Sequence, residues 1–282
     1  MKREYRIGLY EKAMPPFLSW AEKLRAAKKA GYDFVEISID ETDEKLARLK
    51  MPKNERLALI QTMFDEKIPI RTMCLSGHRK YPLGSENPAA RARSLQIMED
   101  ALDLAADLGV RIIQLAGYDV YYEQPSERTR ELFLEGLAKS VEMAAARGVM
   151  LAFETMETEF MNTVEKAMVY VRKINSPYLG VYPDCGNITN AAKAHNLSAA
   201  ADLERGRGAI AAVHLKETVP GKFREVPYGE GHVDFEEIIK TSFTLGVSLF
   251  VTEFWWTGQE DYLSLISTSK RFIDDKFAQA IG

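Results

Sequence analysis

The stretch VMLAFETM at residues 149–156 decides the fold, because it is one of eight short apolar runs that recur at intervals of about 30 to 40 residues. Longer amphipathic stretches lie between these runs. The other seven runs are IGLYE (7–11), FVEISID (34–40), IRTMCLS (70–76), RIIQLAG (111–117), LGVYPD (179–184), IAAVHLKE (210–217) and LFVTEFW (249–255). Strands that alternate with helical stretches predict βα units and a parallel sheet.

The stretches between the runs have the apolar spacing of helices, and each ends near a glycine or at a turn into the next run. We expect helices at residues 19–30, 53–67, 90–108, 127–147, 163–174, 197–206, 234–245 and within 260–279. No linker or low-complexity stretch interrupts the series, and near-continuously apolar strands are typical of a sheet covered on both faces. We therefore predict an α/β protein with a single (β/α)8 TIM barrel domain that spans residues 1–282.

An open, doubly wound sheet is the alternative architecture for the same alternation. Such a sheet would normally carry a glycine-rich phosphate-binding turn after its first strand. The corresponding stretch, YEKAMPPF at 10–17, is not such a turn. The closed barrel is therefore the favoured prediction.

The composition is that of an ordinary globular chain, with 282 residues of which 46% are hydrophobic and 28% charged. A net charge of -4 gives no overall positive field, so we expect no nucleic-acid partner, whereas a local basic pocket is still allowed. The two cysteines, Cys74 and Cys185, make neither a disulfide framework nor a CxxC zinc pair. No apolar run approaches the length of a membrane span, so we expect a cytoplasmic protein without a membrane partner.

Ionisable side chains lie late in four successive runs, at Glu154, Asp184, His214 and Glu253. Successive members are 30, 30 and 39 residues apart, which is close to one βα unit each. In a barrel, the carboxyl ends of the strands meet at one face, where polar side chains are placed for chemistry rather than for packing. Three carboxylates and one imidazole at this face predict a divalent metal site.

This mixed oxygen and nitrogen set suits one Mn²⁺, Co²⁺, Zn²⁺ or Mg²⁺ ion, since no thiolate selects a soft ion and imidazole disfavours an all-oxygen calcium cage. The residues alone do not choose among these ions. The alternative is structural, with buried salt bridges to Lys216 or a nearby arginine, or with His214 as a hydrogen-bonded core histidine. Four matched strand ends favour the metal site over that alternative.

Other candidate binding residues have weaker support. The segment SGHRK at 76–80 follows the third run and places His78, Arg79 and Lys80 where a loop can bind an anion, although a solvated basic loop explains it equally well. The cysteines are interpreted as small buried residues, since neither belongs to a catalytic motif with a histidine. Trp255 or Trp256 is a candidate for a pocket wall, with core packing as the alternative.

Seven blocks of the sequence carry a resemblance to a known family. They are GLYEKAMP (8–15), DFVEISIDETDE (33–44), MCLSGHRKYPLGS (73–85), IQLAGYDVYY (113–122), VYPDCGN (181–187), AVHLKET (212–218) and VPYGEGHVDF (226–235). As a set, over nearly the whole chain, they resemble the L-ribulose-5-phosphate 3-epimerases, also called L-xylulose-5-phosphate 3-epimerases. The resemblance implies interconversion of L-ribulose 5-phosphate and L-xylulose 5-phosphate in L-ascorbate or related pentose catabolism, by a homodimer or larger homo-oligomer.

The resemblance also implies roles for single residues. In related ketose 3-epimerases, the ends of the last four strands hold the metal through a set that matches Glu154, Asp184, His214 and Glu253. The free-sugar epimerases carry a histidine three residues after the metal aspartate and an arginine six residues after the metal histidine. This chain has Asn187 and Pro220 at those positions, which is compatible with a phosphorylated substrate held by other groups.

A phosphorylated ketose needs its own contacts. We expect the phosphate to be bound by His78, Arg79 and Lys216. The next candidates for the phosphate are Arg224 and the backbone amides around Gly229 and Gly231. Asn187 is expected to line the substrate site as well.

Epimerisation at carbon 3 removes a proton from one face of a 2-ketose and returns a proton to the other face through a cis-enediolate. A metal ion chelated by O2 and O3 polarises the carbonyl, while carboxylates on opposite sides of the sugar act as base and acid. We expect Glu154 and Glu253 to have these catalytic roles. Glu157 and Glu217 are expected to orient them or to hydrogen-bond the hydroxyl groups of the substrate.

Three other functions compete with this one. A DNA-repair endonuclease of the same superfamily uses several zinc ions, but this chain has four histidines and only His214 lies at a metal-bearing strand end. An aldose-ketose isomerase shares fold and metal but moves the proton between C1 and C2. A non-catalytic sugar-binding or scaffold protein leaves the four ionisable strand ends unexplained.

Overall fold

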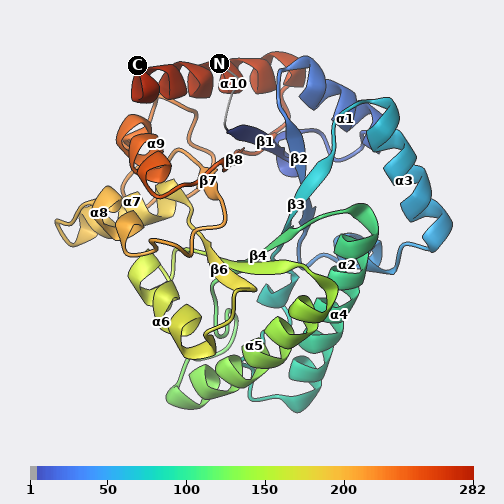
Figure 1. The fold of residues 1–282 in the computed structure, drawn as a ribbon, viewed down its shortest axis with the longest axis vertical. Coiled ribbons are helices and arrows are strands. Elements are labelled where there is room, and N and C mark those ends of the chain that lie inside the picture. Colours follow the sequence, from blue (N-terminus) through green and yellow to red (C-terminus); the bar gives the residue numbers. More distant parts are fainter. Residues whose placement is uncertain (1–4) are drawn as a thin grey trace.

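The computed structural model describes residues 5–282, and eight parallel strands form its centre (Figure 1). The strands are β1 (Arg6–Tyr10), β2 (Phe34–Ile39), β3 (Ile70–Leu75), β4 (Ile112–Ala116), β5 (Met150–Glu154), β6 (Leu179–Tyr182), β7 (Val213–Leu215) and β8 (Leu249–Thr252). Each overlaps the run predicted for it, so all eight predicted strands are confirmed. The largest difference is at β7, which is shorter than the run at 210–217 because only its central residues pair with β8.

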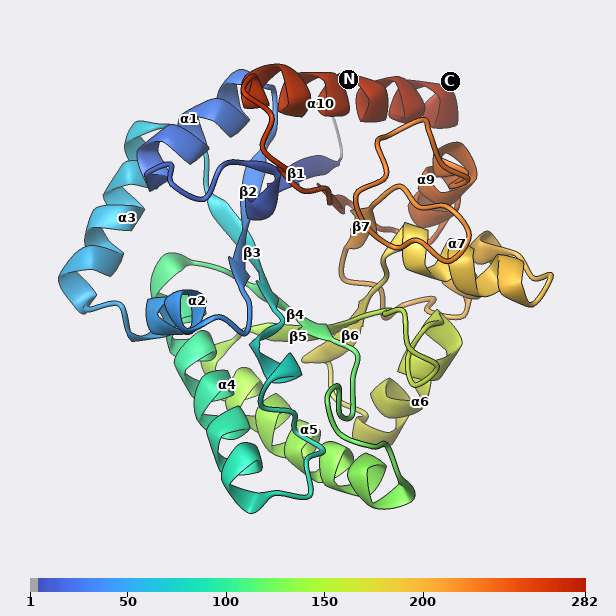
Figure 2. The same ribbon diagram turned by 180° about the vertical axis from the view of Figure 1, so that it is seen from behind.

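Helices surround the strands on the outside, as the two opposite views show (Figure 1 and Figure 2). They are α1 (Trp20–Lys29), α2 (Asp43–Ala47), α3 (Lys53–Asp65), α4 (Pro88–Leu108), α5 (Glu127–Arg147), α6 (Val164–Ile174), α7 (Cys185–Ala194), α8 (Ala199–Glu204), α9 (Phe235–Thr244) and α10 (Tyr262–Ile281). Short 3₁₀ turns follow β1, α2 and β3, as η1 (Glu11–Ala13), η2 (Arg48–Lys50) and η3 (Gly77–Arg79). Helices α2 and α7 were not predicted from the sequence.

The strand order closes a ring. Hydrogen-bonded neighbours run in the order β6-β5-β4-β3-β2-β1-β8-β7, so the first strand pairs with the last. Parallel bridges between Val181 and Ile210, and between Asp184 and His214, join β6 to the β7 segment. The predicted (β/α)8 barrel is therefore confirmed, and the open doubly wound sheet is excluded.

Local sequence signals set the helix ends. Ser19 begins α1 with a capping box, in which its hydroxyl accepts the N–H of Glu22 and the Glu22 carboxylate accepts the N–H of Ser19. Gly109 and Gly148 end α4 and α5 in the left-handed region, at φ 76° and 64°. These are the glycines at which the sequence predicted that the two long helices stop.

Strand side chains alternate between two cores, as the period of a strand requires. On β2, Val35 and Ile37 belong to the large core between the strands and the helices, whereas Phe34 belongs to a smaller cluster with Tyr10 and Val251 inside the barrel. Among residues 5–282, no helix combines the length and the apolarity needed to cross a membrane.

Candidate active site

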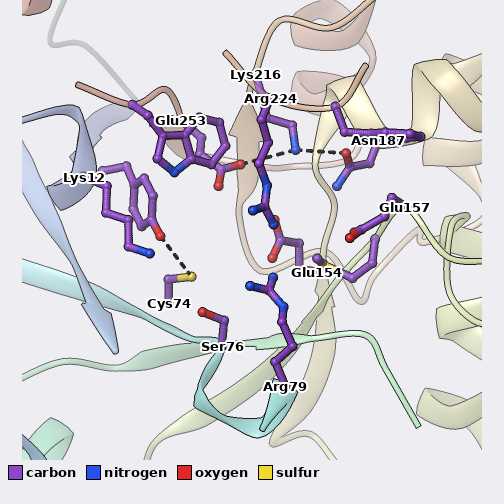
Figure 3. Close-up of a pocket in the computed structure, with 14 residues that line it drawn as sticks. Lys12, Cys74, Ser76, Arg79, Glu154, Glu157, Asn187, Lys216, Arg224 and Glu253 are labelled. Atoms are coloured by element: carbon purple, nitrogen blue, oxygen red, sulfur yellow. Dashed lines mark hydrogen bonds and ion pairs between the residues drawn. The ribbon is translucent and has the colours of Figure 1, made fainter. Parts of the chain in front are cut away.

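A pocket lies at the carboxyl ends of the strands, the face on which TIM barrels carry their sites (Figure 3). Its lining comes from the ends of β1, β3, β5, β7 and β8, from the start of α7 and from the loop after β7. The lining residues are Tyr10, Lys12, Cys74, Ser76, Arg79, Glu154, Met156, Glu157, Asn187, Lys216, Phe223, Arg224, Glu253 and Trp255.

The four predicted metal ligands converge beside this pocket. One ligand atom from each of them lies within 4.8 Å of the others, and the set is Glu154, Asp184, His214 and Glu253. Nδ1 of His214 lies 3.5 Å from Oε1 of Glu154 and 3.2 Å from Oε2 of Glu253. Oδ2 of Asp184 is 4.0 Å from the same nitrogen. All four side chains are buried, so the strand-end pattern in the sequence corresponds to one compact cluster.

Strand ends and one helix start position these side chains. Glu154 is the last residue of β5, and Glu253 directly follows β8, where its N–H donates to the carbonyl of Leu215 at 2.9 Å. Asp184 is the N-cap of α7, with Oδ1 accepting the N–H of Asn187 at 2.7 Å. One oxygen of Asp184 therefore fixes the helix start, and the other faces the cluster.

Burial and the nearby charges shift the pKa values of the acidic groups in the cluster. Burial and the nearby charge of Glu253 raise the pKa of Glu154. Burial also raises the pKa of Asp184, against the opposing effect of Lys216. For Glu253 burial acts in the same direction, but Lys216 and His214 outweigh it and lower the pKa. The opposite pKa shifts of Glu154 and Glu253 follow from the crowding of several carboxyl groups into one small buried volume.

The residues present fit a divalent metal ion. Oδ2 of Asp184 and Oε2 of Glu253 are buried and have no hydrogen-bond partner within residues 5–282. The ammonium of Lys216 lies 3.0 Å and 3.7 Å from these oxygens, which are ion-pair distances without hydrogen-bond geometry. Buried carboxylate oxygens without partners are costly unless a cation satisfies them. Hard oxygen donors with one imidazole nitrogen suit Mn²⁺, Co²⁺, Zn²⁺ or Mg²⁺.

Lys216 and Asn187, both predicted to bind substrate, border the cluster. Nζ of Lys216 donates to Oδ1 of Asn187 at 2.9 Å, and Nδ2 of Asn187 donates to the carbonyl of Thr155 at 2.7 Å. Burial alone would lower the pKa of Lys216, but Asp184 and Glu253 raise it, so the side chain stays an ammonium ion. Its positive charge is therefore placed beside the carboxylates.

Arg79 and Glu157 line the pocket together, linked by two tyrosines. The guanidinium of Arg79 lies over the rings of Tyr118 and Tyr121, 5.6 Å and 5.0 Å from their centroids. The carboxylate of Glu157 accepts the hydroxyl of Tyr118 at 2.6 Å. Nε of Arg79 is buried without a hydrogen-bond partner in the described part of the chain. Burial opposes its charge, but Tyr118 and Glu157 raise the pKa of Arg79, so the guanidinium remains charged.

Two further cations line the pocket. Arg224, on the loop after β7, lies over the ring of Trp255 at 5.7 Å, and Figure 3 shows Arg79 and Arg224 pointing into the pocket from opposite walls. Nζ of Lys12 lies 2.6 Å from Oδ2 of Asp40. Positive groups that converge on one cavity favour an anionic ligand.

His78 lies outside the pocket, which removes the support for its predicted contact with substrate. Its side chain is buried, and Nε2 lies 3.1 Å from the carbonyl of Ser94 on α4. Burial lowers the pKa of His78 to about 4. The imidazole is therefore neutral at neutral pH and offers no charge to a phosphate.

Glu217 also faces away from the pocket, contrary to its predicted place beside the substrate. Its Oε2 accepts the N–H of Gly229 at 3.1 Å, and its Oε1 accepts the N–H of Val233 at 3.1 Å. Glu217 thus holds the loop 219–233, which carries Arg224. Because the N–H of Gly229 is engaged, that amide is not free to bind an anion.

Several pocket residues were not anticipated from the sequence. They are Tyr10, Lys12, Cys74, Ser76, Met156 and Phe223. The strand-end rule that predicted the four candidate metal ligands would also have found Lys12 and Ser76, since they follow β1 and β3 closely. The two cysteines are buried free thiols, as interpreted. A buried acid inside β2, Glu36, was missed too, and its carboxylate lies 2.6 Å from Nε2 of His214.

Comparison with known proteins adds the family. The family model described as xylose isomerase-like TIM barrel matches residues 24–272. The chain belongs to this family. The L-ribulose-5-phosphate 3-epimerase UlaE of Escherichia coli (strain SE11) is 42% identical over 281 residues, which cover 99% of this chain and 98% of the relative. The protein of the same name from Shigella sonnei (strain Ss046) matches with the same identity and coverage. The resemblance predicted from the sequence blocks is confirmed.

Solved structures agree with the fold of this xylose isomerase-like barrel. An L-ribulose 3-epimerase superposes with a TM-score of 0.80 at 19% identity, covering 98% of this chain and 96% of that chain. The 3-keto-D-glucoside 4-epimerase YcjR from E. coli, in its apo form, superposes with a TM-score of 0.77 at 18% identity, covering 96% and 99%. Such low identities show the fold alone. The sequence relatives are sugar epimerases, and the protein is accordingly an enzyme of the isomerase class.

Proposed function

We propose that this enzyme is a metal-dependent 3-epimerase that interconverts L-ribulose 5-phosphate and L-xylulose 5-phosphate. The observation that carries the proposal is one pocket that joins a buried carboxylate and imidazole cluster to the guanidinium groups of Arg79 and Arg224. A ketose phosphate presents hydroxyl and carbonyl oxygens to the cluster and a dianion to the guanidinium groups. The identity to the relative named L-ribulose-5-phosphate 3-epimerase supports the choice of substrate.

One divalent ion, of Mn²⁺, Co²⁺, Zn²⁺ or Mg²⁺, would be held by Glu154, Asp184, His214 and Glu253. When bound, it supplies Lewis-acid stabilisation of the negative charge that develops on O2 and O3 of the ketose. The ammonium of Lys216, fixed beside Asp184 and Glu253, adds a positive charge in the same place.

Glu154 and Glu253 are the proposed catalytic acid and base. Glu154 ends β5 and Glu253 follows β8, at the two ends of the arc of strands that carries the cluster, so a sugar bound between them presents opposite faces to the two carboxylates. One carboxylate takes the proton from C3, and the other returns a proton to the opposite face. The roles exchange with the direction of the reaction, as an epimerase that runs both ways requires.

The phosphate is proposed to bind to Arg79 and Arg224, with Lys12 and Ser76 as further donors in the same pocket. Arginine suits this role because its planar fork matches two phosphate oxygens at once. His78 is absent from this set because it is neutral and turned toward α4. Lys216 was predicted to bind the phosphate, but it is proposed here to lie at the reacting end of the substrate, beside Asp184 and Glu253.

The hydroxyl groups of the ketose are proposed to contact Asn187 and Glu157, which line the pocket on the β5 and β6 side. The cytoplasmic location, the homodimer and the lack of a nucleic-acid partner remain predictions of the sequence. Sedimentation of the purified protein tests the dimer.

The proposal is tested by incubating the metal-loaded enzyme with L-xylulose 5-phosphate and identifying the products by ¹³C NMR. L-Ribulose 5-phosphate should form until the two epimers reach equilibrium, and free L-xylulose should react far more slowly. An aldopentose phosphate as the product would indicate an aldose-ketose isomerase instead. No conversion of the ketose phosphate would contradict the proposal.

A further inference from the structure

Glu36 is an acidic residue in a strand interior that otherwise holds apolar and small side chains. It lies in β2 and is 0% exposed. Its neighbours Val35 and Ile37 face the helix layer, so Glu36 shares the inner face of the barrel with Phe34. A buried carboxylate is costly unless it is paired and hydrogen-bonded, so the partners of Glu36 indicate its role.

Both oxygens of the Glu36 carboxylate have partners on other strands. Oε1 lies 2.6 Å from Nε2 of His214 on β7. Oε2 accepts the hydroxyl of Thr72 at 2.7 Å and the hydroxyl of Tyr182 at 3.0 Å. The ring of Tyr182 also packs against the imidazole of His214, with centroids 4.8 Å apart. The imidazole is therefore in contact with a carboxylate at Nε2 and with an aromatic ring in a T-shaped arrangement.

This arrangement separates the two nitrogens of His214. Nε2 lies 2.6 Å from Oε1 of Glu36, whereas Nδ1 lies 3.5 Å and 3.2 Å from the carboxylates of Glu154 and Glu253. With its hydrogen on Nε2 donated to Glu36, the imidazole would present the lone pair of Nδ1 to a metal ion held by those carboxylates. A metal-binding imidazole ligates through one nitrogen and commonly donates the N–H of the other to a carboxylate, which fixes the tautomer and strengthens the ligand. Glu36 has the position of that carboxylate.

We propose that Glu36 is a positioning residue that fixes the tautomer and orientation of His214 and thereby sets the affinity of the cluster for its metal ion. The inference rests on the metal site of the proposed function. It extends that site from four ligands at the strand ends to a second layer in the middle of the barrel, where Thr72 and Tyr182 in turn orient Glu36.

The first test compares Zn²⁺ affinity in wild-type protein and in Glu36→Gln, by competition with a chromophoric chelator. The variant should bind Zn²⁺ about 10- to 100-fold more weakly, because the neutral amide is a poorer partner for the imidazole. Tyr182→Phe is the matched control, since it removes one hydrogen bond to Glu36 but leaves the contact with His214, and its affinity should change far less. Circular dichroism checks that both variants are folded.

The second test does not depend on a variant that folds. In wild-type protein loaded with Zn²⁺ and labelled with ¹⁵N, the imidazole spectrum of His214 should show the proton on Nε2 and none on Nδ1. A proton on Nδ1, or unchanged Zn²⁺ affinity in folded Glu36→Gln, would overturn the inference and leave the proposed function standing. Wild-type protein that binds no divalent ion would overturn both.

Discussion

Nδ1 of His214 lies 3.2 Å from Oε2 of Glu253, and that carboxylate oxygen is buried without a hydrogen-bond partner among residues 5–282. Oδ2 of Asp184, in the same cluster, is also buried without a hydrogen-bond partner among the described residues. The ammonium of Lys216 lies 3.0 Å and 3.7 Å from these two oxygens without a hydrogen bond to either, so a cation bound between them would satisfy both. We therefore expect a bound divalent ion to stabilise the fold of this site as well as to serve its chemistry.

Removal of the metal should abolish turnover and lower the melting temperature. Protein stripped with a chelator is expected to regain activity on addition of Mn²⁺, Co²⁺ or Zn²⁺. At a free ion concentration of one hundred times Kd, binding should stabilise the fold by about 2.7 kcal/mol, since the ion binds the folded cluster and not the unfolded chain. Differential scanning calorimetry with and without the ion measures this shift. Full activity in metal-free protein is the result that excludes the scheme.

Replacing either proposed proton-transfer residue should slow the reaction strongly while the pocket still binds the substrate. Glu154→Gln and Glu253→Gln should each lower kcat by about two to four orders of magnitude, the usual size of a lost general acid or base. Because both residues are also proposed metal ligands, the metal content of each variant must be measured and saturated before turnover is compared. Glu157→Gln is the matched control in the same pocket and should chiefly raise KM. Near-wild-type exchange of the C3 proton in both ligand variants contradicts the assignment.

The phosphate assignment predicts a selective loss. Arg79→Ala and Arg224→Ala should each lower kcat/KM for the ketose phosphate about 10- to 100-fold, because one charge-assisted contact contributes about 1.5 to 3 kcal/mol. Their effect on the unphosphorylated ketose should be small. Lys80→Ala and Lys222→Ala, on neighbouring positions outside the pocket, should change neither substrate. Equal losses for both substrates in the arginine variants indicate that the phosphate binds elsewhere.

The carboxylate of Glu11 is buried among the cations of Lys23, Lys45 and Arg48, at 2.9, 2.8 and 2.7 Å, and this ion network predicts a pH dependence of stability. Burial opposes the charge of Glu11, but Lys45, Lys23 and Arg48 outweigh it and lower its pKa from 4.5 to about 2. A carboxyl group whose folded pKa is depressed contributes stability above its unfolded pKa and loses that contribution as the pH falls through the folded value. The contribution is on the order of 3 kcal/mol at most, since burial of Lys45 lowers the pKa of that ammonium and offsets part of it.

Urea unfolding at several pH values tests this contribution. Glu11→Gln should be clearly less stable than wild type at pH 7, and the difference should shrink as the pH falls from about 4.5 toward 2. Asp43→Asn, which removes an exposed ion pair with Lys80, serves as the control and should cost little at any pH. A difference between wild type and Glu11→Gln that does not depend on pH would contradict the account of this network.

The loop that carries Arg224 depends on a close approach of backbone to carboxylate. A Cβ on Gly231 would lie 2.1 Å from Oε1 of Glu217, so Gly231→Ala must displace the anchor of the loop. We expect a stability loss of about 1 to 3 kcal/mol and a higher KM, with metal affinity unchanged. Gly221→Ala is the control in the same loop, because its Cβ meets nothing within 4 Å and only its left-handed φ of 73° costs stability, about 1 kcal/mol. Equal KM in the two variants would show that Glu217 does not position Arg224.

Much of the barrel could be predicted from the sequence because its strands are apolar and its helix ends carry glycine signals. The same βα repeat predicted the cluster of Glu154, Asp184, His214 and Glu253, since side chains about one βα unit apart lie at neighbouring strand ends on one face of the barrel. The helix α7 was missed because CGNITN at 185–190 has little helical propensity, and the cap by Asp184 that stabilises its start depends on the fold.

The direction of their side chains explains why Glu217 and His78 lie outside the pocket, although both were predicted to bind the substrate. Glu217 follows Lys216 in an extended segment, where neighbouring side chains point to opposite faces, so only one of the two can line the pocket. That alternation was readable from the sequence. His78 and Arg79 instead share the 3₁₀ turn η3, where each residue turns the chain by about a third of a circle, and propensity alone does not say which of them faces the pocket.

The most direct test of the central claim is the position of solvent deuterium in the product. Metal-loaded enzyme should be incubated with L-xylulose 5-phosphate in deuterated water, and the L-ribulose 5-phosphate formed should be analysed by ¹H and ¹³C NMR. We predict one deuterium at C3 and none at C1, because Glu154 and Glu253 exchange protons with the solvent and act at C3. Deuterium at C1, or a product without deuterium at C3, would contradict the account.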